Sequence, residues 1–580
     1  MSASSIFAFF AGNPAIIMMV GALMCIATPR HLASPILLIA TALSAIKLST
    51  LGLGEYGAIT LFGEQIVTLR LDRLSRLFAI AFHIAAALNI IYAWGQKDRA
   101  QNFATLAYPA AALGGVLAGD MITLFVWWEI AAITSVFLVW APGTRATYVS
   151  GMRYLAIQVL SGVLLLAGIV LIYRETGSLA FDFVGLRDDA TGAIKLSALV
   201  MFLAFGIKCA FPLLHTWVQD AYPKSTISGT IILSVFTTKL AVYALARAFP
   251  GTSELIYIGA VMTIFPIFFA LIENDLRKVL TYSINNQVGF MVVGIGIGTA
   301  GALNGAVGYA FSNIIFESLL FMAVGAAMFR TGTSKATELG GLYRTMPLTM
   351  TFCIIGALSI SAFPFFAGFV TKGLIVDGAG GVNIWVWLTL LFASAGVLEH
   401  AGIKIPYFTF FGHDSGKRPK EAPIGMLVAM SIAAVLSIGI GVFPEPLYAL
   451  LPNQEQIAGY NPYTAYHIIE QLQLLLWAVL AFAVLVLIKW YPPEIPSTNL
   501  DVDWLWRVPG RALLSWASGA SRATWNALWG IFAGRIHALM ARIYAMHGPE
   551  GQMARSWPVG YMALWTAVLL GFVLILSFLG

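Results

Sequence analysis

Apolar segments of about twenty residues recur through nearly the whole of this chain, with short polar connections between them. An α-helix needs that length to cross the hydrocarbon core of a bilayer. The composition agrees, because 59% of the 580 residues are hydrophobic and only 10% are charged. A soluble globular domain carries about 25% charge. The sequence therefore predicts an all-α polytopic membrane protein and excludes a soluble one.

The spacing of the apolar segments predicts about sixteen transmembrane helices. The expected spans are residues 5–27, 32–53, 74–95, 103–119, 120–141, 149–173, 193–217, 225–249, 253–272, 279–299, 302–330, 346–376, 383–411, 424–446, 469–490 and 558–579. The first residues, MSASSIF, lack the basic start of a cleavable signal. We therefore expect the first helix to be retained.

Basic residues gather in every other connection between these spans. The odd-numbered connections contain Arg30, Lys97, Arg99, Arg145, Lys224, Arg277, Lys278, Arg330, Lys335, Arg344, Lys417, Arg418 and Lys420. The even-numbered ones are acidic or mixed, with Glu55, Glu64, Asp182, Asp188, Asp189 and Glu445. Positively charged loops stay in the cytoplasm, so we expect both termini to face outward.

Residues 503–545 differ in kind from the spans. Their apolar residues recur at three- and four-residue steps, while Arg535 and Arg542 share another face. A helix of about forty residues would reach about 60 Å. Tryptophan on one face and arginine on the other predict an amphipathic helix along the cytoplasmic interface. The alternative is two shorter helices kinked at Gly519 or Gly530.

Two lysines lie inside apolar runs of the stretch 202–247. Lys208 stands in FGIKCAFPLLHTW and Lys239 in LSVFTTKLAVYALAR. A charge at the middle of a bilayer costs roughly 2.5–3.5 kcal/mol, so each lysine must face protein or water. Pro212 lies one turn after Lys208 and predicts a helix break beside the charge. This pattern is typical of a proton or ion relay, with a lysine paired to a carboxylate as the structural alternative.

Further charged residues lie inside the expected spans on both sides of this stretch. The full set is Glu129, Lys208, His215, Asp220, Lys239, Glu317, Lys372, Glu399, His400 and Lys404. Lys372 follows a second helix-breaking proline, Pro364. Burial moves the pKa of lysine down and that of a carboxylate up, towards values at which protons exchange at neutral pH. Acid and base alternating along successive helices therefore favour a proton pathway.

The two prolines stand in similar sequences. CAFPLL at 209–214 and SAFPFF at 361–366 both place Ala-Phe-Pro in an expected span near a lysine. Lys208 precedes its proline and Lys372 follows its own. Transporters built from inverted repeats have broken helices at corresponding positions of their two halves. The pair hints at internal symmetry.

Sequence signatures of cofactor sites are missing. There is no CxxC, HExxH, dinucleotide GxGxxG or P-loop, and Cys25, Cys209 and Cys353 are scattered through apolar runs. We therefore expect no cofactor, no metal site and no redox centre. The net charge of +6 suits basic cytoplasmic loops and does not indicate nucleic-acid binding.

Several motifs in order resemble the antiporter-like subunits shared by respiratory complex I, Mrp-type multisubunit cation/proton antiporters and membrane-bound hydrogenases. The similarity covers roughly residues 70–415 and is greatest to the D-type subunits of Mrp antiporters. The matching residues are Trp128-Glu129, Lys208 through Ala221 with His215, Trp217 and Asp220, Lys239 with Tyr243, Asp275 and Lys278 leading to Tyr282-Ser283, and Gly368, Phe369 and Lys372.

The resemblance implies a proton channel of two inverted five-helix repeats. Glu129 with Lys208 would gate one half-channel, Lys239 would connect the halves, and Lys372 would terminate the second. His215 is a further candidate proton-translocating residue. The implied organisation is N-terminal helices at 1–100, a core at 101–415 with repeats at 103–249 and 253–411, further helices at 416–495, a lateral helix at 496–557 and a last span at 558–580.

The sequence departs from the family at the eleventh helix, where Asn313 and Glu317 replace a histidine and a lysine. Prolines are also missing from the turn at Lys224-Ser225-Thr226. A buried Glu317 would be either protonated or paired with a lysine such as Lys239 or Lys372. With Asp220, Glu399, His400 and Lys404, it is a candidate ion-coupling residue.

The resemblance implies an ion-translocating subunit of a monovalent cation/proton antiporter, and not an enzyme in itself. Its partners would be other membrane subunits, protons, Na⁺ or K⁺ and the lipid of a bacterial inner membrane. One alternative is a proton-pumping subunit of a complex I-type enzyme or hydrogenase. Others are an energy-coupling subunit for bicarbonate uptake and a scaffold that no longer conducts.

Overall fold

The structure, a computed structural model, describes residues 12–61, 63–186, 192–491, 494–495, 499–551, 553–555 and 558–579. The predicted Asp188 and Asp189 of the sixth connection lie outside these residues. The chain divides into two compact units, Met1–Asn499 and Leu500–Gly580. Each unit is described by itself.

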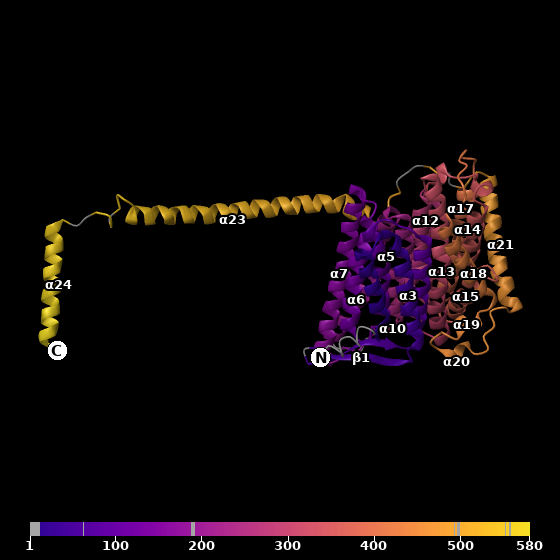
Figure 1. The fold of residues 1–580 in the computed structure, drawn as a ribbon, viewed down its shortest axis with the longest axis horizontal. Helices are drawn as coiled ribbons and strands as arrows, with labels where there is room; N and C mark the ends of the chain where they lie inside the picture. The colour runs from indigo at the N-terminus through magenta and orange to yellow at the C-terminus, as the bar shows by residue number, and fades with distance from the viewer. Residues whose placement is uncertain are drawn as a thin grey trace. The chain divides into compact units, whose positions relative to one another are not determined.

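The first unit is a bundle of helices (Figure 1). Its first helices are α2 (Pro14–Ala27), α3 (Ala33–Thr50), α4 (Arg73–Tyr92), α5 (Arg99–Val116), α6 (Met121–Trp140), α7 (Arg145–Thr176), α8 (Gly192–Lys208), α9 (Thr216–Ala221), α10 (Ile227–Ala248), α11 (Ser253–Ile272) and α12 (Leu276–Ile297). The later ones are α13 (Ala300–Thr331), α14 (Pro347–Ile360), α15 (Ala367–Gly380), α16 (Ile384–Val397), α17 (Lys404–Pro406), α18 (Ile424–Val442), α19 (Glu445–Tyr448), α20 (Gln454–Ile457) and α21 (Ala465–Leu487). Two π-helical segments, η5 (Leu398–Ile403) and η6 (Tyr407–Phe411), flank α17.

Eleven helices of the described residues are long and apolar enough to cross a membrane. The protein is therefore a polytopic helical membrane protein, as its composition predicts. Short polar connections start these helices through capping side chains. Asp72 accepts a hydrogen bond from the backbone N–H of Ser75 at the start of α4, and Asp120 and Thr144 cap α6 and α7 in the same way.

Helices α10 and α13 form the centre of the bundle. The most apolar window of α10 is entirely buried and that of α13 is 94% buried, against 39% for α7 at the periphery. Helices α11 and α12 approach each other closely, because a Cβ atom on Gly289 would lie 2.7 Å from the backbone nitrogen of Thr263. Such backbone contact through small residues is how membrane helices pack.

The helical bundle also contains a β-hairpin, which was not predicted. Strands β1 (Gly54–Leu61) and β2 (Glu64–Leu71) pair antiparallel in the connection between α3 and α4, with Tyr56 opposite Leu69. The backbone N–H of Arg70 donates to the Leu117 carbonyl, which fixes β2 to the connection between α5 and α6. The hairpin, α19 and α20 lie at one end of the bundle, here called the hairpin end (Figure 1).

Both Ala-Phe-Pro sequences break their helices, and the two breaks have the same backbone geometry. The backbone φ is positive at Ala210 and Leu213 in the first break and at Ala362 and Phe365 in the second. The same hydrogen bonds recur: Phe211 N–H donates to the Gly206 carbonyl and Phe363 N–H to the Leu358 carbonyl, each at 3.0 Å. The break predicted beside Lys208 is confirmed, because α8 ends at that residue.

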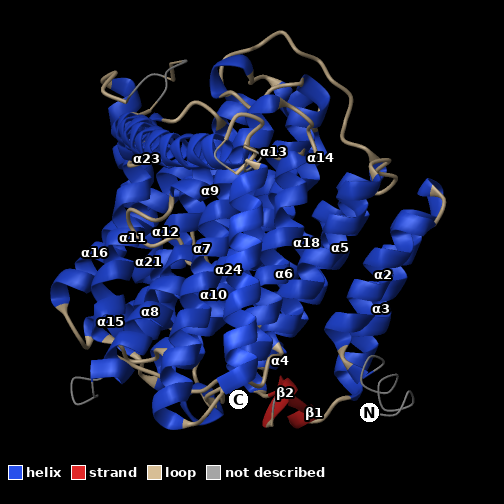
Figure 2. Cartoon of the chain, turned by 90° about the vertical axis from the view of Figure 1, so that its left-hand side faces the viewer, coloured by secondary structure: helices blue, strands red, loops and turns tan. Residues whose placement is uncertain are grey.

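The two broken helices run in opposite directions. Figure 2 shows α8 and α15 nearer the hairpin end and α9 and α14 nearer the opposite end. The chain enters the first break from the hairpin end and leaves the second break towards it. Lys208 before its break and Lys372 after its own therefore both belong to the helix half at the hairpin end.

The second unit contains α22 (Trp504–Arg507), α23 (Pro509–His547) and α24 (Val559–Leu579). Helix α23 is 39 residues long, and Gly519 and Gly530 lie within it. The alternative of two shorter helices is therefore wrong. Helix α24 is one of the eleven helices that could cross a membrane.

Candidate functional site

Charged side chains lie deep in the first unit. Lys208, Lys239, Glu317 and Lys372 each expose 2% or less of their surface, and Lys404 is fully buried. Removing a charge from water is costly unless partners or water compensate for it. The partners of each charged group therefore indicate what it does.

Lys208 contacts helix α6 directly. Its Nζ donates a 2.7 Å hydrogen bond to the Trp128 carbonyl and lies 4.2 Å from the centre of the Trp128 ring. The indole Nε1 of Trp128 in turn donates to the Ser161 hydroxyl on α7. A lysine over an aromatic face gains a cation–π attraction. The last residue of α8 is thus held against α6 at the first break.

Glu129 follows Trp128 and is half-buried. Its carboxylate fills the space left by Gly162 on α7, since a Cβ atom there would lie 1.5 Å from Glu129 Oε1. This Oε1 has no hydrogen-bond partner among the described residues. No ion pair joins Glu129 to Lys208 in the described part of the chain, although the backbone next to Glu129 binds Lys208.

His215 and Asp220 stand at either end of α9. The buried His215 ring packs against Phe265, with ring centres 4.6 Å apart. Asp220 forms ion pairs with Arg153 at 2.7 Å and Lys224 at 2.6 Å. Asp220 therefore fixes α9 to α7 and to the turn that follows. The contact of Arg153 was not predicted, because nothing in its local sequence indicates a partner 67 residues away.

Lys239 and Glu317 form a buried ion pair between α10 and α13. Lys239 Nζ lies 3.1 Å from Glu317 Oε2 and also donates to the Ser234 carbonyl at 3.0 Å. This confirms pairing with Lys239, one of the alternatives for Glu317. Removing one member of such a pair leaves a buried charge without compensation, so the two residues depend on each other.

Further buried polar side chains on the helices of this pair and on α12 have no hydrogen-bond partner among the described residues. They form a central polar cluster on α10, α12 and α13, which consists of Thr238, Ser283, Asn285, Ser312 and Asn313. Thr238 precedes Lys239, and Asn313 lies one helical turn before Glu317. Buried polar atoms are normally satisfied by protein or by ordered water. The cluster therefore offers positions for water at the centre of the bundle.

Helix α13 leads from the Lys239–Glu317 pair to Lys372. Gly308 of α13 lies against α15 next to Lys372, since a Cβ atom on it would be 3.3 Å from Thr371 Cγ2. Nine residues separate Gly308 from Glu317, which is about 14 Å along the helix. Asn313 and Ser312 lie in this interval.

Lys372 differs from the other buried lysines. Its Nζ has no hydrogen-bond partner among the described residues and lies 4.1 Å from the centre of the Phe290 ring. Phe290 belongs to α12, so Lys372 points from the second break towards the middle of the bundle. The Lys372 ammonium group thus lies against an aromatic face and has no hydrogen-bond acceptor among the described residues.

Lys404 has a structural role, because it holds α17 to the end of α11. Its Nζ donates to the carbonyls of Ala270, Leu271 and Glu273 at the end of α11. It also pairs with Glu494 at 2.7 Å. Sequence analysis missed Glu494, which lies in a polar segment outside the expected core.

Glu399 and His400, two further candidate ion-coupling residues, lie in the π-helical segment η5. His400 is buried and its Nδ1 lies 2.6 Å from the Gly396 carbonyl. Glu399 is half-buried. Segment η5 contacts the second break, because a Cβ atom on Gly402 would lie 2.4 Å from Ser361 Oγ.

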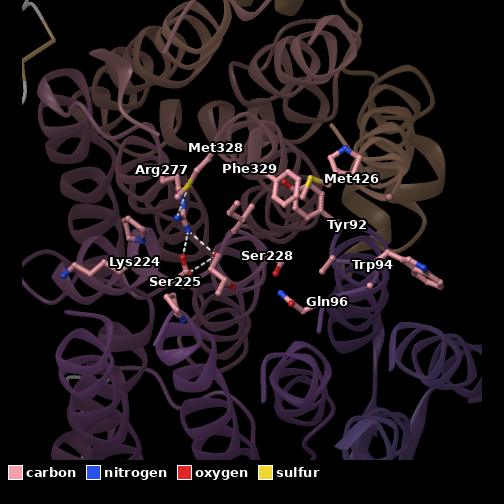
Figure 3. Close-up of a pocket in the computed structure, with 18 residues that line it drawn as sticks. Tyr92, Trp94, Gln96, Lys224, Ser225, Ser228, Arg277, Met328, Phe329 and Met426 are labelled. Atoms are coloured by element: carbon pink, nitrogen blue, oxygen red, sulfur yellow. Dashed lines mark hydrogen bonds between the residues drawn. The ribbon is translucent and has the colours of Figure 1, made fainter. Parts of the chain in front are cut away.

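A cavity of about 750 Å³ opens at the end of the bundle opposite the hairpin (Figure 3). Its labelled lining residues are Tyr92, Trp94, Gln96, Lys224, Ser225, Ser228, Arg277, Met328, Phe329 and Met426. Arg277 donates to the carbonyls of Ser225 and Thr226, so this buried arginine holds the turn before α10. Sequence analysis treated Arg277 only as a loop charge.

Residues 118–398 match the family described as "NADH:quinone oxidoreductase/Mrp antiporter, TM". The D subunit of the Na(+)/H(+) antiporter of Alkalihalophilus pseudofirmus is 28% identical over 349 residues, which are 58% of this chain and 71% of that protein. The putative antiporter protein mnhD2 of Staphylococcus aureus is 26% identical over 412 residues, which are 68% of this chain and 82% of that protein.

Two solved structures share the fold. A chain of the membrane-bound sulfane sulfur reductase, an archaeal respiratory membrane complex, has a TM-score of 0.69 at 22% identity and covers 97% of this chain and 100% of its own. A chain of the Mrp complex from Dietzia sp. DQ12-45-1b has a TM-score of 0.74 at 22% identity and covers 93% of this chain and 63% of its own.

Proposed function

Because residues 118–398 of this chain belong to the NADH:quinone oxidoreductase/Mrp antiporter family, we propose that the protein is the ion-translocating subunit of a multisubunit monovalent cation/proton antiporter. Two of its curated relatives are named as antiporter subunits. The proposal rests on the buried lysines Lys208 and Lys372, which lie beside two helix breaks that run in opposite directions. Chains of that kind conduct ions along charged residues that face protein or water.

In this proposal a proton moves between Lys208, the Lys239–Glu317 pair and Lys372 through water held by the central polar cluster. Lys208 and Glu129 serve one half-channel together with His215, and Lys372 terminates the other. Lysine suits this work because a partly desolvated ammonium group releases its proton far more readily than a guanidinium group does. Asp220, His400 and Lys404 act as supports in this scheme, since each contacts backbone or an opposite charge. Glu399 stays a candidate ion-coupling residue.

The organisation we propose consists of about sixteen spans in the membrane, with inverted five-helix repeats at 103–249 and 253–411. The repeated break geometry supports the repeats. We further propose that α23 is a lateral helix along the cytoplasmic interface, that both termini face outward, and that the protein assembles with other membrane subunits in a bacterial inner membrane. The basic connections at the end of the bundle opposite the hairpin support this orientation, since Lys97 lies between α4 and α5 and Arg145 starts α7 there.

A second candidate function is that of a proton-pumping subunit in a redox-linked complex. The likeness to a chain of a respiratory complex extends over 97% of this chain. A proton-pumping subunit of a redox-linked complex would use the same buried charges, with its electron carriers on other chains. Purification of the native complex separates the two functions: co-purified small membrane subunits without redox centres support the antiporter, and flavin or iron–sulfur subunits support the pump.

The direct test measures Na⁺- or K⁺-dependent proton movement in membrane vesicles that contain the assembled complex. We expect Lys208→Ala to lower flux by roughly 100-fold or more, as loss of a proton-carrying group does. Lys208→Arg should fail as well, because guanidinium does not release its proton near neutral pH. The matched control is Lys97→Ala, which changes an exposed lysine of a connection. Flux near wild type in either Lys208 variant would refute the relay.

A further inference from the structure

A small cavity beside Lys372 connects this lysine with polar side chains on α21. The cavity has a volume of about 20 Å³, which is room for one water molecule. Lys372, Gly373 and Asp377 of α15 line it from one side, and His467 and Glu470 of α21 from the other. Helix α21 lies outside residues 118–398, which match the family.

Helix α21 is fixed to the second break by specific contacts. The side-chain amide of Gln471 donates to the Ser361 carbonyl at 3.2 Å, at the end of α14. The His467 ring stacks on Phe369 of α15, with ring centres 4.6 Å apart and planes 18° from parallel. These contacts hold His467 and Glu470 at the hairpin-end half of the broken helix that contains Lys372.

The geometry of His467 leaves one ring nitrogen free to exchange a proton. Its Nδ1 lies 2.9 Å from the Pro462 carbonyl, so Nδ1 is the protonated nitrogen. Nε2 then has a lone pair, and it lies against Gly373, the residue after Lys372. A Cβ atom on Gly373 would be 2.6 Å from Nε2, so only glycine allows the ring to approach this closely.

Polar groups become more exposed along this line. Lys372 exposes 2% of its surface and its Nζ has no hydrogen-bond partner among the described residues. His467 and Glu470 are half-buried, and Asp377 is exposed. The cavity therefore lies between a fully buried proton donor and carboxylates that reach the hairpin end.

We propose that His467, with Glu470 and Asp377, forms the proton path between Lys372 and the hairpin-end surface. The inference rests on the proposed function and deepens it. An N–H bond of the Lys372 ammonium breaks as the cavity water accepts that proton and passes one of its own to His467 Nε2. The imidazolium then releases its Nε2 proton to the carboxylate of Glu470 or Asp377, which returns it to bulk water. The same steps in reverse load Lys372 from that surface.

The test uses the assembled complex in membrane vesicles and begins with His467→Ala. We expect proton flux to fall by at least roughly tenfold, since a positioned proton carrier is lost. Added imidazole should restore most of the flux, because His467→Ala leaves a space between Phe369 and Gly373 that an imidazole molecule fits. The matched control on the same helix is Tyr466→Ala, since the Tyr466 side chain is 76% exposed. Its flux should stay at the wild-type level with and without imidazole.

Lys372→Ala, measured alongside, separates this inference from the proposed function. If Lys372→Ala abolishes flux and His467→Ala does not lower it, the path through α21 is overturned and the proposed function stands. Wild-type flux in Lys372→Ala overturns both. A loss in His467→Ala that imidazole does not restore shows a structural role and overturns the path. If His467→Ala does not assemble, His467→Gln decides, because glutamine keeps much of the volume but cannot exchange the proton.

Discussion

Lys208 and Lys372 lie beside helix breaks with the same backbone but have different partners. Lys208 donates to a carbonyl of α6 and lies over the Trp128 ring. Lys372 has the Phe290 ring, a cavity for one water and no hydrogen bond within the described residues. The Ala-Phe-Pro sequence thus determines where each helix breaks, while helices far away in the sequence determine what surrounds each lysine.

The difference suits unequal tasks for the two lysines. A lysine whose ammonium group donates to a carbonyl is held in one place, whereas one that faces only a ring and water can turn. We therefore expect the Lys208 side chain to be held more firmly than that of Lys372. The Lys239–Glu317 pair lies between them, so a change there should disturb both.

The largest expected effect follows from breaking that pair. Glu317→Lys places two ammonium groups where an ion pair stood, at a cost of roughly 3–5 kcal/mol in stability. We expect loss of both assembly and flux, although the substitution restores the residue of the resembling family. Thermal unfolding of the purified complex and vesicle flux are the two measurements.

The matched variant is the exchanged pair Lys239→Glu with Glu317→Lys, which keeps one charge of each sign. It should recover much of the stability that Glu317→Lys loses. If the Glu317→Lys complex has the unfolding temperature and the flux of the wild type, the ion pair has no role in holding α10 against α13.

A smaller effect should distinguish the two break lysines directly. Lys208→Met gives up a charge-assisted hydrogen bond worth roughly 1.5–3 kcal/mol, whereas Lys372→Met gives up no hydrogen bond to a described residue. We therefore expect the Lys372→Met complex to unfold at a higher temperature than the Lys208→Met complex, although both lose flux. Equal unfolding temperatures would mean that the two lysines have equivalent surroundings.

The smallest effect concerns the glycines that face each site. A methyl group on Gly162 meets the flexible end of Glu129, which can move aside. A methyl group on Gly373 meets the His467 ring, which is held by Phe369. We expect Gly373→Ala to cost roughly 1–3 kcal/mol and Gly162→Ala less than about 0.5–1 kcal/mol. Unfolding of the two complexes under identical conditions measures the difference, and the reverse order would contradict this view of the packing.

The sequence predicted the features that depend on local chemistry. Proline and lysine inside apolar runs located both breaks and the buried charges, and the three- and four-residue periodicity located α23. The hairpin was missed because its strands occupy a short connection between two much stronger helical signals. Strands of eight residues leave no mark in a search for spans of about twenty residues.

The partners of the buried charged residues were harder to predict than the positions of these residues in the helices. Glu317 was expected to be protonated or to pair with a lysine such as Lys239 or Lys372, and only the packing of α10 against α13 selects Lys239. Arg153 and Glu494 contact Asp220 and Lys404 across long sequence separations, so no local pattern could reveal them. Glu129 and Lys208 were expected to act together, yet their side chains reach different atoms, Gly162 and the Trp128 carbonyl.

The left-handed residues of the breaks determine how these joints behave mechanically. Ala210, Leu213, Ala362 and Phe365 all have positive φ, a conformation that costs a residue with a side chain roughly 1–2 kcal/mol. Glycine would relieve that cost and leave the chain free to swing. With side chains at all four positions, the backbone of each break has fewer accessible conformations than glycine would give it. In the proposed function, this favours transfer of protons by water and rotating side chains over movement of the backbone at the two breaks.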